Sequence, residues 1–177
     1  LQRARERCAP LGDRVTFARA DALALDFPDG GFDLAVSRHV LQAVPDARRA
    51  VADLARVTRP GGWLHVIAED YGMLWCHPLD GGGPDSDGFW QRLPHLFAEA
   101  VGCDNKIGRK LFTHLHDLGL RDVGADYIVV DTLRVPRDTF AAIWEAWRDG
   151  YTDALVEHTP ATRAEVDQWW RKLIACA

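Results

Sequence analysis

The chain lacks several features that would point to specialised classes of protein. None of its apolar runs approaches the roughly 20 residues that cross a bilayer. Its four cysteines are scattered, without the paired spacing of a disulfide framework, so we expect reduced thiols in a cytoplasm. The net charge of −5 argues against nucleic acid as a partner, because phosphate binding needs a basic face. The arginines between positions 48 and 59 fall at helical spacing and predict a solvated face.

Motifs of several enzyme classes are also missing. No Gly-x-Ser-x-Gly elbow of a hydrolase and no Gly-x-Gly-x-x-Gly turn of a dinucleotide-binding enzyme occurs. The cluster 81–85 follows no predicted strand directly, so it favours a flexible lid over a phosphate cradle. His114 and His116 lie two positions apart on a predicted helix and so point to different faces, and Cys76-His77 has no second pair at zinc spacing. We therefore expect no metal site.

What the chain does contain is a strand-and-helix pattern over residues 15–70. Alternating residues predict strands over 15–19 and 32–37, joined through a turn at 28–31. A helix begins after Asp46 and is stopped by Pro60 and two glycines, and a third strand over 63–68 is apolar enough to be covered on both faces. Strands joined through a helix of this length predict a right-handed crossover and a parallel sheet. With 47% apolar residues, the 177-residue chain can form one core.

Three segments carry a family resemblance: 19–34, 37–42 and 56–62. In this order and spacing they resemble a class I S-adenosylmethionine-dependent methyltransferase of the small-molecule type that includes the ubiquinone and menaquinone biosynthesis enzymes. The resemblance covers about residues 1–70 and implies an α/β, Rossmann-like, mostly parallel sheet. It further implies S-adenosylmethionine as cofactor and an oxygen, nitrogen or carbon atom of a small molecule as methyl acceptor.

Candidate cofactor-binding residues follow the predicted strands. Ligands of open α/β sheets bind beyond the carboxyl ends of strands, where Asp21, Ser37 and Asp70 are expected to face one crevice. By resemblance, Asp21 accepts the exocyclic amine of adenine and the N–H of Ala22 meets a ring nitrogen. Ser37 and Arg38 line the ribose and methionine end through main-chain groups. The alternative for Asp21 is an N-cap or a solvated turn residue.

Candidate catalytic residues near the same strand ends are His39, Asp70 and His77. The cofactor's sulfonium makes its methyl group electrophilic, so the protein must align the acceptor and exclude water. An oxygen or acidic carbon acceptor is helped by a base, for which His39 is the best placed. Alternatively, His39 packs on the turn as a helix-start residue, and a nitrogen or thiolate acceptor needs no base.

The pattern departs from the family at both ends. Neither a glycine-rich turn after a first strand nor a final strand is present, which predicts a partial domain over 1–177 that is weakly active or inactive alone. Two other classes stay open, a dinucleotide-dependent oxidoreductase and a non-catalytic Rossmann-like remnant or binding module.

The second half of the chain predicts an insertion and a helical segment. Residues 71–105, rich in aromatics, predict a lid-like insertion that either shapes the substrate or packs on the core. A helix is expected over 111–118 and a strand over 125–131. The segment 136–177 predicts two helices, the first capped by Asp138 and the second by a Thr162–Glu165 capping box. The aromatic stripe of Trp144, Trp147 and Tyr151 fits either a substrate cavity or the core.

Overall fold

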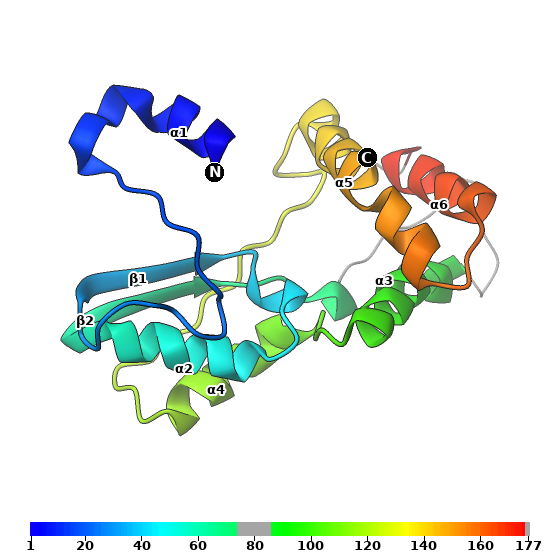
Figure 1. The fold of residues 1–177 in the computed structure, drawn as a ribbon. Helices are drawn as coiled ribbons and strands as arrows, with labels where there is room; N and C mark the ends of the chain where they lie inside the picture. Colours follow the sequence, from blue (N-terminus) through cyan, green and yellow to red (C-terminus); the bar gives the residue numbers. More distant parts are fainter. Residues whose placement is uncertain (74–85, 176–177) are drawn as a thin grey trace. The chain divides into compact units, whose positions relative to one another are not determined.

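The computed structural model describes residues 1–73 and 86–175, and only the backbone of residues 86–91. Helices and a two-stranded sheet give an α/β fold, as predicted (Figure 1). The chain divides into two compact units. Unit 1 consists of Leu1–Val36 and Arg48–His65, and unit 2 of Ser37–Ala47 and Val66–Ala177. No helix among the described residues is both long and apolar enough to cross a bilayer.

Most elements of the amino-terminal half form where the sequence predicts them. The order is α1 (Gln2–Cys8), η1 (Ala9–Arg14), β1 (Phe32–Arg38), η2 (Leu41–Ala43), α2 (Ala47–Val57) and β2 (Thr58–Ile67). The turn before β1 is closed by the Gly31 N–H, which donates to the Pro28 carbonyl at 3.3 Å. Helix α2 begins directly after Asp46, as predicted, and ends at Val57. The prediction that Pro60 and the two following glycines stop the helix is wrong, because these residues lie inside β2, which already begins at Thr58.

Strands β1 and β2 run parallel, as their connection through α2 predicts. Just past the carboxyl end of β1, the His39 N–H donates to the carbonyl of Ile67, the last residue of β2, at 2.9 Å. Near the amino end of β1 and at the middle of β2, a Cβ built on Gly62 would lie 2.8 Å from the Asp33 carbonyl oxygen. The glycine therefore permits a close approach of the two backbones that no larger residue allows.

Two predicted strands do not form. Residues 15–19 and 125–131 belong to no strand in the described part of the chain. Side chains of the second segment stand in solvent, with Tyr127 80% and Ile128 74% exposed. Alternation of apolar residues marks a segment able to pair, but a strand also needs a neighbour that supplies backbone hydrogen bonds. Residues 58–67 have such a neighbour in β1.

The sheet is covered on one face only, so the prediction that residues 63–68 are buried on both faces is wrong. Ala35 of β1 is buried, whereas its neighbours Leu34 and Val36 are 52% and 56% exposed. On β2, Trp63 is 71% exposed. In unit 1, burial is concentrated on α2, where Ala50 and Val51 are at most 1% exposed. An apolar strand sequence thus indicates a surface suited to burial and does not show what covers it.

Unit 2 is mainly helical. Its elements after β2 are η3 (Tyr71–Met73), α3 (Ser86–Val101), η4 (Ile107–Lys110), α4 (Leu111–Asp117), α5 (Arg137–His158) and α6 (Arg163–Ala175). Helix α4 confirms the helix predicted at 111–118, and Gly119 follows it with a φ of 74°. The predicted cap at Asp138 is wrong, because Pro136 is the N-cap and Asp138 lies inside the first turn. Pro136, with φ −51° and ψ 138°, has the non-helical backbone of a cap residue, so the helix begins at Arg137, one residue before Asp138.

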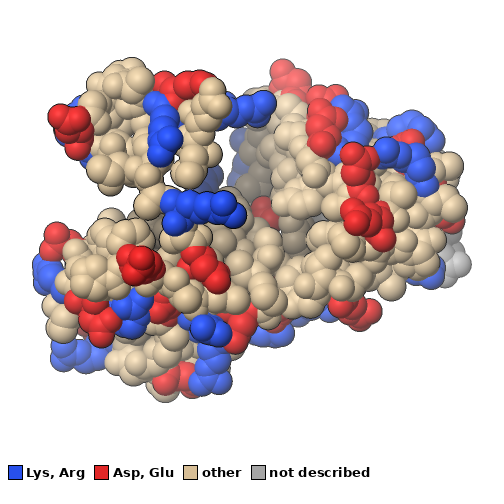
Figure 2. Space-filling model, viewed as in Figure 1, with Lys and Arg blue, Asp and Glu red and all other residues tan. Residues whose placement is uncertain are grey.

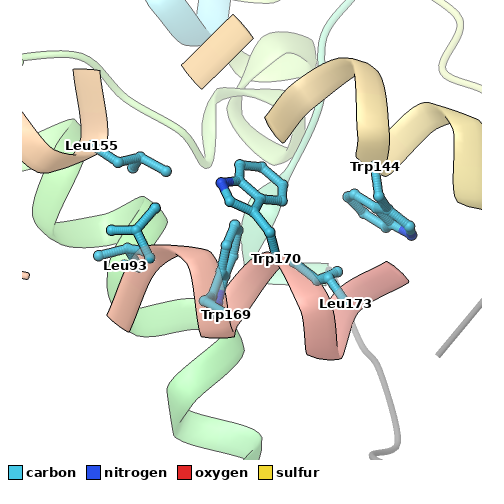
Figure 3. Packing of buried hydrophobic residues seen from close by; sticks show 7 residues of the cluster. Leu93, Trp144, Leu155, Trp169, Trp170 and Leu173 are labelled. Atoms are coloured by element: carbon cyan, nitrogen blue, oxygen red, sulfur yellow. The ribbon is translucent and has the colours of Figure 1, made fainter. Parts of the chain in front are cut away.

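The core of unit 2 lies between α3, α5 and α6 (Figure 3). Trp169 and Trp170 of α6 contact each other edge to face, with ring centroids 4.4 Å apart. Trp144, from α5, is 5% exposed, which supports the core interpretation of the aromatic stripe for this residue. The full cluster comprises Leu93, Trp144, Leu155, Val166, Trp169, Trp170 and Leu173. Burial of these large side chains is the main source of stability for the three helices.

Two aromatic residues of the predicted insertion pack on this helical core. Tyr71 meets Trp147 of α5 edge to face at 5.5 Å, and Phe97 lies against the cluster. The side chains of Phe89 and Trp90 and the whole of Trp75 and His77 lie outside the described residues. For Tyr71 and Phe97 the packing interpretation therefore holds, while the lid-like role of residues 71–105 stays a prediction.

A first prediction concerns this core. Leu173 is 0% exposed and Leu133 is 93% exposed. Replacing Leu173 with Ala removes apolar contacts and leaves a cavity, so we expect Leu173→Ala to lower the free energy of unfolding by about 2–5 kcal/mol. Leu133→Ala is the matched control and should change it by less than about 0.5 kcal/mol. Urea unfolding followed by circular dichroism measures both, and equal effects would contradict the assigned core.

The predicted capping box at the start of α6 is confirmed. The Thr162 N–H donates to Glu165 Oε2 at 2.7 Å, and the Glu165 N–H donates to Thr162 Oγ1 at 3.3 Å. The Thr162 hydroxyl also donates to Glu165 Oε2 at 2.7 Å, and the two hydrogen bonds that this oxygen accepts from Thr162 hold the pKa of Glu165 below its ordinary value. The charged form of Glu165 is therefore favoured by folding.

A second prediction concerns the pH dependence of this cap. A lowered pKa in the folded state means that Glu165 stabilises the fold above its unfolded pKa and loses this contribution as the pH falls through its folded pKa. We expect Glu165→Gln to lower the melting temperature at pH 7 and to leave it nearly unchanged at pH 3. Thermal unfolding at the two pH values tests this. A loss of the same size at both would show that the carboxylate charge is irrelevant.

Candidate functional site

Charged and polar side chains gather where β1 and β2 end, within unit 2. We call His39, Gln42, Glu69, Asp70 and Arg109 the strand-end cluster. His39 follows β1, Gln42 lies in η2, Glu69 and Asp70 follow β2, and Arg109 lies in η4. Parallel strands bring their carboxyl ends to the same edge of the sheet, so residues about 30 positions apart in the sequence become neighbours.

His39 is held by its backbone and by its ring. Its φ of 53° is a left-handed conformation, which residues other than glycine seldom adopt and which costs roughly 1–2 kcal/mol. The hydrogen bond from its N–H to Ile67 fixes this geometry. The ring nitrogen Nδ1 lies 3.3 Å from Glu69 Oε1, and the side chain is 42% exposed. The other ring nitrogen, Nε2, has no partner within the described part of the chain.

Glu69 is the centre of the cluster. While Oε1 faces His39, Oε2 accepts a hydrogen bond from Gln42 Nε2 at 3.1 Å. The Glu69 carbonyl accepts from the N–H of Gly108 at 3.3 Å, which ties the residue to η4. Burial and the charge of this carboxylate raise the pKa of Tyr71 far above its ordinary value, so the phenol stays protonated. Glu69 is thus oriented from several sides.

Asp70 has a different environment from Glu69. Its oxygens accept from Arg109 Nε at 2.5 Å and from Arg109 Nη2 at 2.9 Å, and Oδ1 also accepts from the Gly72 N–H at 2.9 Å. Its side chain is only 9% exposed. The carboxylate raises the pKa of Arg109, so the guanidinium remains charged. Asp70 is therefore committed to a two-pronged ion pair and is poorly suited to accept a proton from a substrate.

The other predicted site residues take varied positions. Ser37 is buried at 7% exposure near the end of β1, and Arg38 is exposed beside it. Asp21 and Ala22 belong to unit 1, where the Leu23 N–H donates to Asp21 Oδ1 at 2.9 Å. This hydrogen bond makes Asp21 a turn residue, the alternative role foreseen for it. A carboxylate has two oxygens, so the turn does not use all of its capacity as an acceptor.

Beside this turn, an ion-pair network closes the loop before β1. Arg56 donates to Asp53 at 2.7 Å, to Asp29 at 2.6 Å and to the carbonyl oxygens of Leu25 and Phe27. These hydrogen bonds raise the pKa of Arg56. The expectation of a merely solvated face is therefore wrong for Arg56. A cavity of about 480 Å³ lies here and contains none of the predicted site residues; its lining is Leu23, Ala24, Leu25, Asp26, Arg49, Ala52, Asp53 and Arg56.

Sequence reasoning missed Glu69, Gln42 and Arg109. Glu69 stands next to Asp70, directly after a predicted strand, and this position was a usable signal. Arg109 is 39 residues from Asp70 and lies in a segment without a recognisable motif, so nothing in the sequence connected the two. Predicted residue His77 lies outside the described residues.

The donor set fits S-adenosylmethionine chemically. This molecule carries a sulfonium cation, an exocyclic amine and ribose hydroxyls, and a carboxylate such as that of Asp21 can accept from the amine and the hydroxyls. On the face seen in Figure 2, acidic and basic side chains are interspersed. Among residues 1–73 and 86–175, no three His, Cys, Asp or Glu side chains are placed to hold a metal ion. Cys8 and Cys103 are free thiols.

Comparisons with known proteins agree with the resemblance seen in the sequence. Residues 1–66 match the family described as "Methyltransferase domain". A probable chloroplastic tocopherol O-methyltransferase of Oryza sativa subsp. japonica is 42% identical over 67 residues, which are 38% of this chain and 17% of the rice protein. A demethylmenaquinone methyltransferase of Thermus thermophilus is 42% identical over 64 residues, or 36% of this chain and 29% of that protein.

A third relative has another type of acceptor in its name. A phosphatidylethanolamine N-methyltransferase of Cereibacter sphaeroides is 38% identical over 79 residues, which are 42% of this chain and 39% of that protein. The matches thus cover 17–39% of the lengths of these three relatives. Their names include both O- and N-methyltransferases, so these relatives agree on methyl transfer and differ in the acceptor atom.

A third prediction concerns the Asp70–Arg109 pair. Replacing Arg109 with Met keeps its apolar stem but leaves the nearly buried Asp70 carboxylate without its partner, which is costly. We expect Arg109→Met to lower the melting temperature by roughly 2–5 °C. Arg148→Met is the matched control, because its pair with Asp149 is exposed on both sides and should contribute little. Calorimetric melting distinguishes the two, and indistinguishable variants would argue against a structural role for the pair.

Proposed function

Because residues 1–66 match the family described as "Methyltransferase domain", we propose that the complete protein transfers a methyl group from S-adenosylmethionine to a small-molecule acceptor. The family match carries this proposal. It is supported by the parallel strand–helix–strand arrangement that ends in polar residues at one edge of the sheet. We further propose that the protein acts in the cytoplasm, without a nucleic-acid or membrane partner, as its composition predicts.

Four residues are proposed to hold the cofactor. Asp21 accepts from the adenine amine, and the Ala22 N–H donates to a ring nitrogen. Ser37 and Arg38 bind the ribose and methionine end through their main chain. When bound, the cofactor supplies an electrophilic methyl group on a positively charged sulfur, and the protein's task is to orient the acceptor and exclude water.

For proton removal from the acceptor, His39 is the candidate that the geometry supports best. It is partly exposed and has a carboxylate on one ring nitrogen. Asp70, predicted as an alternative base, is held by Arg109 and takes the role of fixing the loop after β2. His77 stays a predicted candidate from the sequence alone.

Of the alternatives, the comparisons favour the methyltransferase over a dinucleotide-dependent oxidoreductase, because the matching family and the named relatives are methyltransferases. A non-catalytic binding module remains the rival proposal for this chain, since it carries only part of the length of those relatives. Binding of S-adenosylhomocysteine separates the methyltransferase from both alternatives, because the non-catalytic module has no working cofactor site and the oxidoreductase would bind NAD instead.

The fourth prediction is a binding experiment on the complete protein. We expect calorimetry to detect S-adenosylhomocysteine binding and no NAD binding. Asp21→Asn keeps an oxygen for the Leu23 turn but replaces the second acceptor oxygen with an N–H₂ group. Losing a hydrogen bond of a charged group costs about 1.5–3 kcal/mol, so affinity should fall roughly 10- to 100-fold.

Asp13→Asn, which changes an exposed aspartate of η1, is the matched control and should bind normally. Unchanged affinity in Asp21→Asn would remove Asp21 from the cofactor site. Binding of NAD instead of S-adenosylhomocysteine would overturn the proposed reaction.

A further inference from the structure

The contacts of Arg56 in unit 1 support a further assignment, which rests on the proposed methyltransferase function. We propose that Arg56 is a positioning residue for the turn at residues 21–24, which we call the adenine turn. Arg56 holds the backbone that follows this turn and thereby places Asp21 and Ala22 for contact with the cofactor. It acts through Leu25 and does not itself touch the cofactor. The hydrogen bonds of residues 21–30 carry the argument.

The first step is how the adenine turn is held together. The Ala24 N–H donates to the Asp21 carbonyl at 3.1 Å, and the Leu23 N–H donates to Asp21 Oδ1 at 2.9 Å. Both hydrogen bonds lie within the turn, so they fix its shape and not its place in the fold. Apart from the isolated bridge between Asp21 and Ala24, residues 15–31 take part in no strand. Pairing with the sheet therefore does not fix the place of the turn either.

The second step is the attachment of Leu25, the residue directly after the turn. Its N–H donates to Asp53 Oδ2 at 2.5 Å, and its carbonyl accepts from Arg56 Nη2 at 2.8 Å. Asp53 also accepts from Arg56 Nε at 2.7 Å. We call Asp53 and Arg56 the α2 clamp, because both lie on helix α2. The clamp satisfies both backbone groups of Leu25 and so ties the end of the adenine turn to this helix.

The third step is the reach of the same guanidinium along the segment. Arg56 Nη1 donates to the Phe27 carbonyl at 2.9 Å and to Asp29 Oδ1 at 2.6 Å, and the Arg56 carbonyl accepts from the Gly30 N–H at 2.9 Å. The hydrogen bonds to Asp53 and Asp29 raise the pKa of Arg56, so the side chain stays charged. A planar guanidinium can hold acceptors in several fixed directions at once, which the single ammonium of a lysine cannot do.

The fourth step is the cavity of about 480 Å³ beside the clamp. Residues 23–26 line it together with the face of α2 that carries Arg49, Ala52, Asp53 and Arg56. Close packing of apolar side chains normally fixes one segment on another, but here a cavity lies between the segment and the helix. The polar contacts of the clamp are therefore the main attachment of the segment. The Asp53 side chain is 15% exposed and that of Arg56 is 33% exposed, so the clamp is partly shielded from solvent.

The fifth step connects this attachment to binding. A hydrogen bond weakens steeply when its distance or angle departs from the ideal geometry. The contacts proposed for the cofactor, an amine donating to Asp21 and the N–H of Ala22 meeting a ring nitrogen, both depend on where the adenine turn lies. A loosened clamp would move both groups together. We therefore expect Arg56 to affect the recognition of adenine in particular.

The first test examines the clamp in the full-length protein without any ligand. Arg56→Lys keeps the charge and the apolar stem but removes the planar fork. We expect amide hydrogen exchange of residues 22–31 to become about 10-fold faster in this variant, while exchange in α6 stays unchanged. Arg59→Lys is the matched control, because Arg59 donates to Asp33 at 2.6 Å and to the Pro60 carbonyl instead. Unchanged exchange of residues 22–31 in Arg56→Lys would overturn the clamp.

The second test compares two ligands by calorimetry on the full-length protein. S-Inosylhomocysteine has an oxygen in place of the exocyclic amine of S-adenosylhomocysteine and cannot donate there to Asp21. We expect the wild type to prefer the adenosyl compound by about 10- to 100-fold, and Arg56→Lys to reduce this ratio to within about threefold. A merely structural loss would weaken both ligands alike and leave the ratio unchanged. Arg59→Lys should keep the wild-type ratio.

The possible failures are distinguishable. If the wild type does not bind S-adenosylhomocysteine, the proposed methyltransferase falls and this assignment falls with it. If the wild type binds it, an unchanged ratio in Arg56→Lys overturns only the positioning role, and so does a wild-type ratio near one. In the background of Asp21→Asn, Arg56→Lys should change the ratio no further, because both act on the same contact. Additive effects of the two substitutions would show that Arg56 does not act through the adenine turn.

Discussion

The parallel pairing of β1 with β2 is the constraint on which the candidate site depends. Antiparallel strands would place the residues that follow them at opposite edges of the sheet, but parallel strands place them together. Here the His39 N–H bonds to the last residue of β2, so the pairing itself places His39 near Glu69. Gly62 permits this pairing near the amino end of β1. The pairing of the two strands thus determines which side chains of the site lie next to each other.

Within the site, the neighbouring side chains of Glu69 and Asp70 give these two carboxylates different roles. Glu69 and Asp70 are adjacent and chemically alike, yet one faces an imidazole and an amide while the other is held by both prongs of a guanidinium. Pairs of similar groups with different surroundings are a common way to divide structural and proton-transfer tasks in one site. His39 also has an unusual backbone conformation, with a positive φ. Such strained residues persist where the contacts of the surrounding structure hold them in place.

What could be predicted from the sequence was mainly local. The start of α2 after Asp46, the end of α4 before Gly119 and the Thr162–Glu165 box each depend on a few neighbouring residues, and each is confirmed. Contacts between residues far apart in the sequence could not be predicted in this way. The unpaired segments 15–19 and 125–131 have strand-like sequences, but strand formation needs a partner that alternation does not reveal. The start of α5 differs from the prediction, because Asp138 has a side chain typical of an N-cap, whereas Pro136 occupies that position in the structure.

For the site, the sequence located the strand ends and therefore His39 and Asp70, but not the contacts that separate their roles. The Arg109 partner of Asp70 comes from an element 39 residues away, and the orientation of Glu69 depends on Gln42 and Gly108, which lie on either side of it in the chain. Such contacts follow from tertiary structure alone. The roles of Asp21 and Ala22 remain predictions of the family resemblance.

The distribution of tryptophans has a practical consequence for spectroscopy. Trp63 is the one tryptophan of unit 1 and is mostly exposed, whereas Trp144, Trp169 and Trp170 are buried together in unit 2. Among the tryptophans whose side chains the structure describes, most therefore report on the helical cluster, and their emission will shift to longer wavelength when α5 and α6 separate. Of these described tryptophans, Trp63 is the one that lies on the sheet, so it will report ligand-induced changes around β1 and β2.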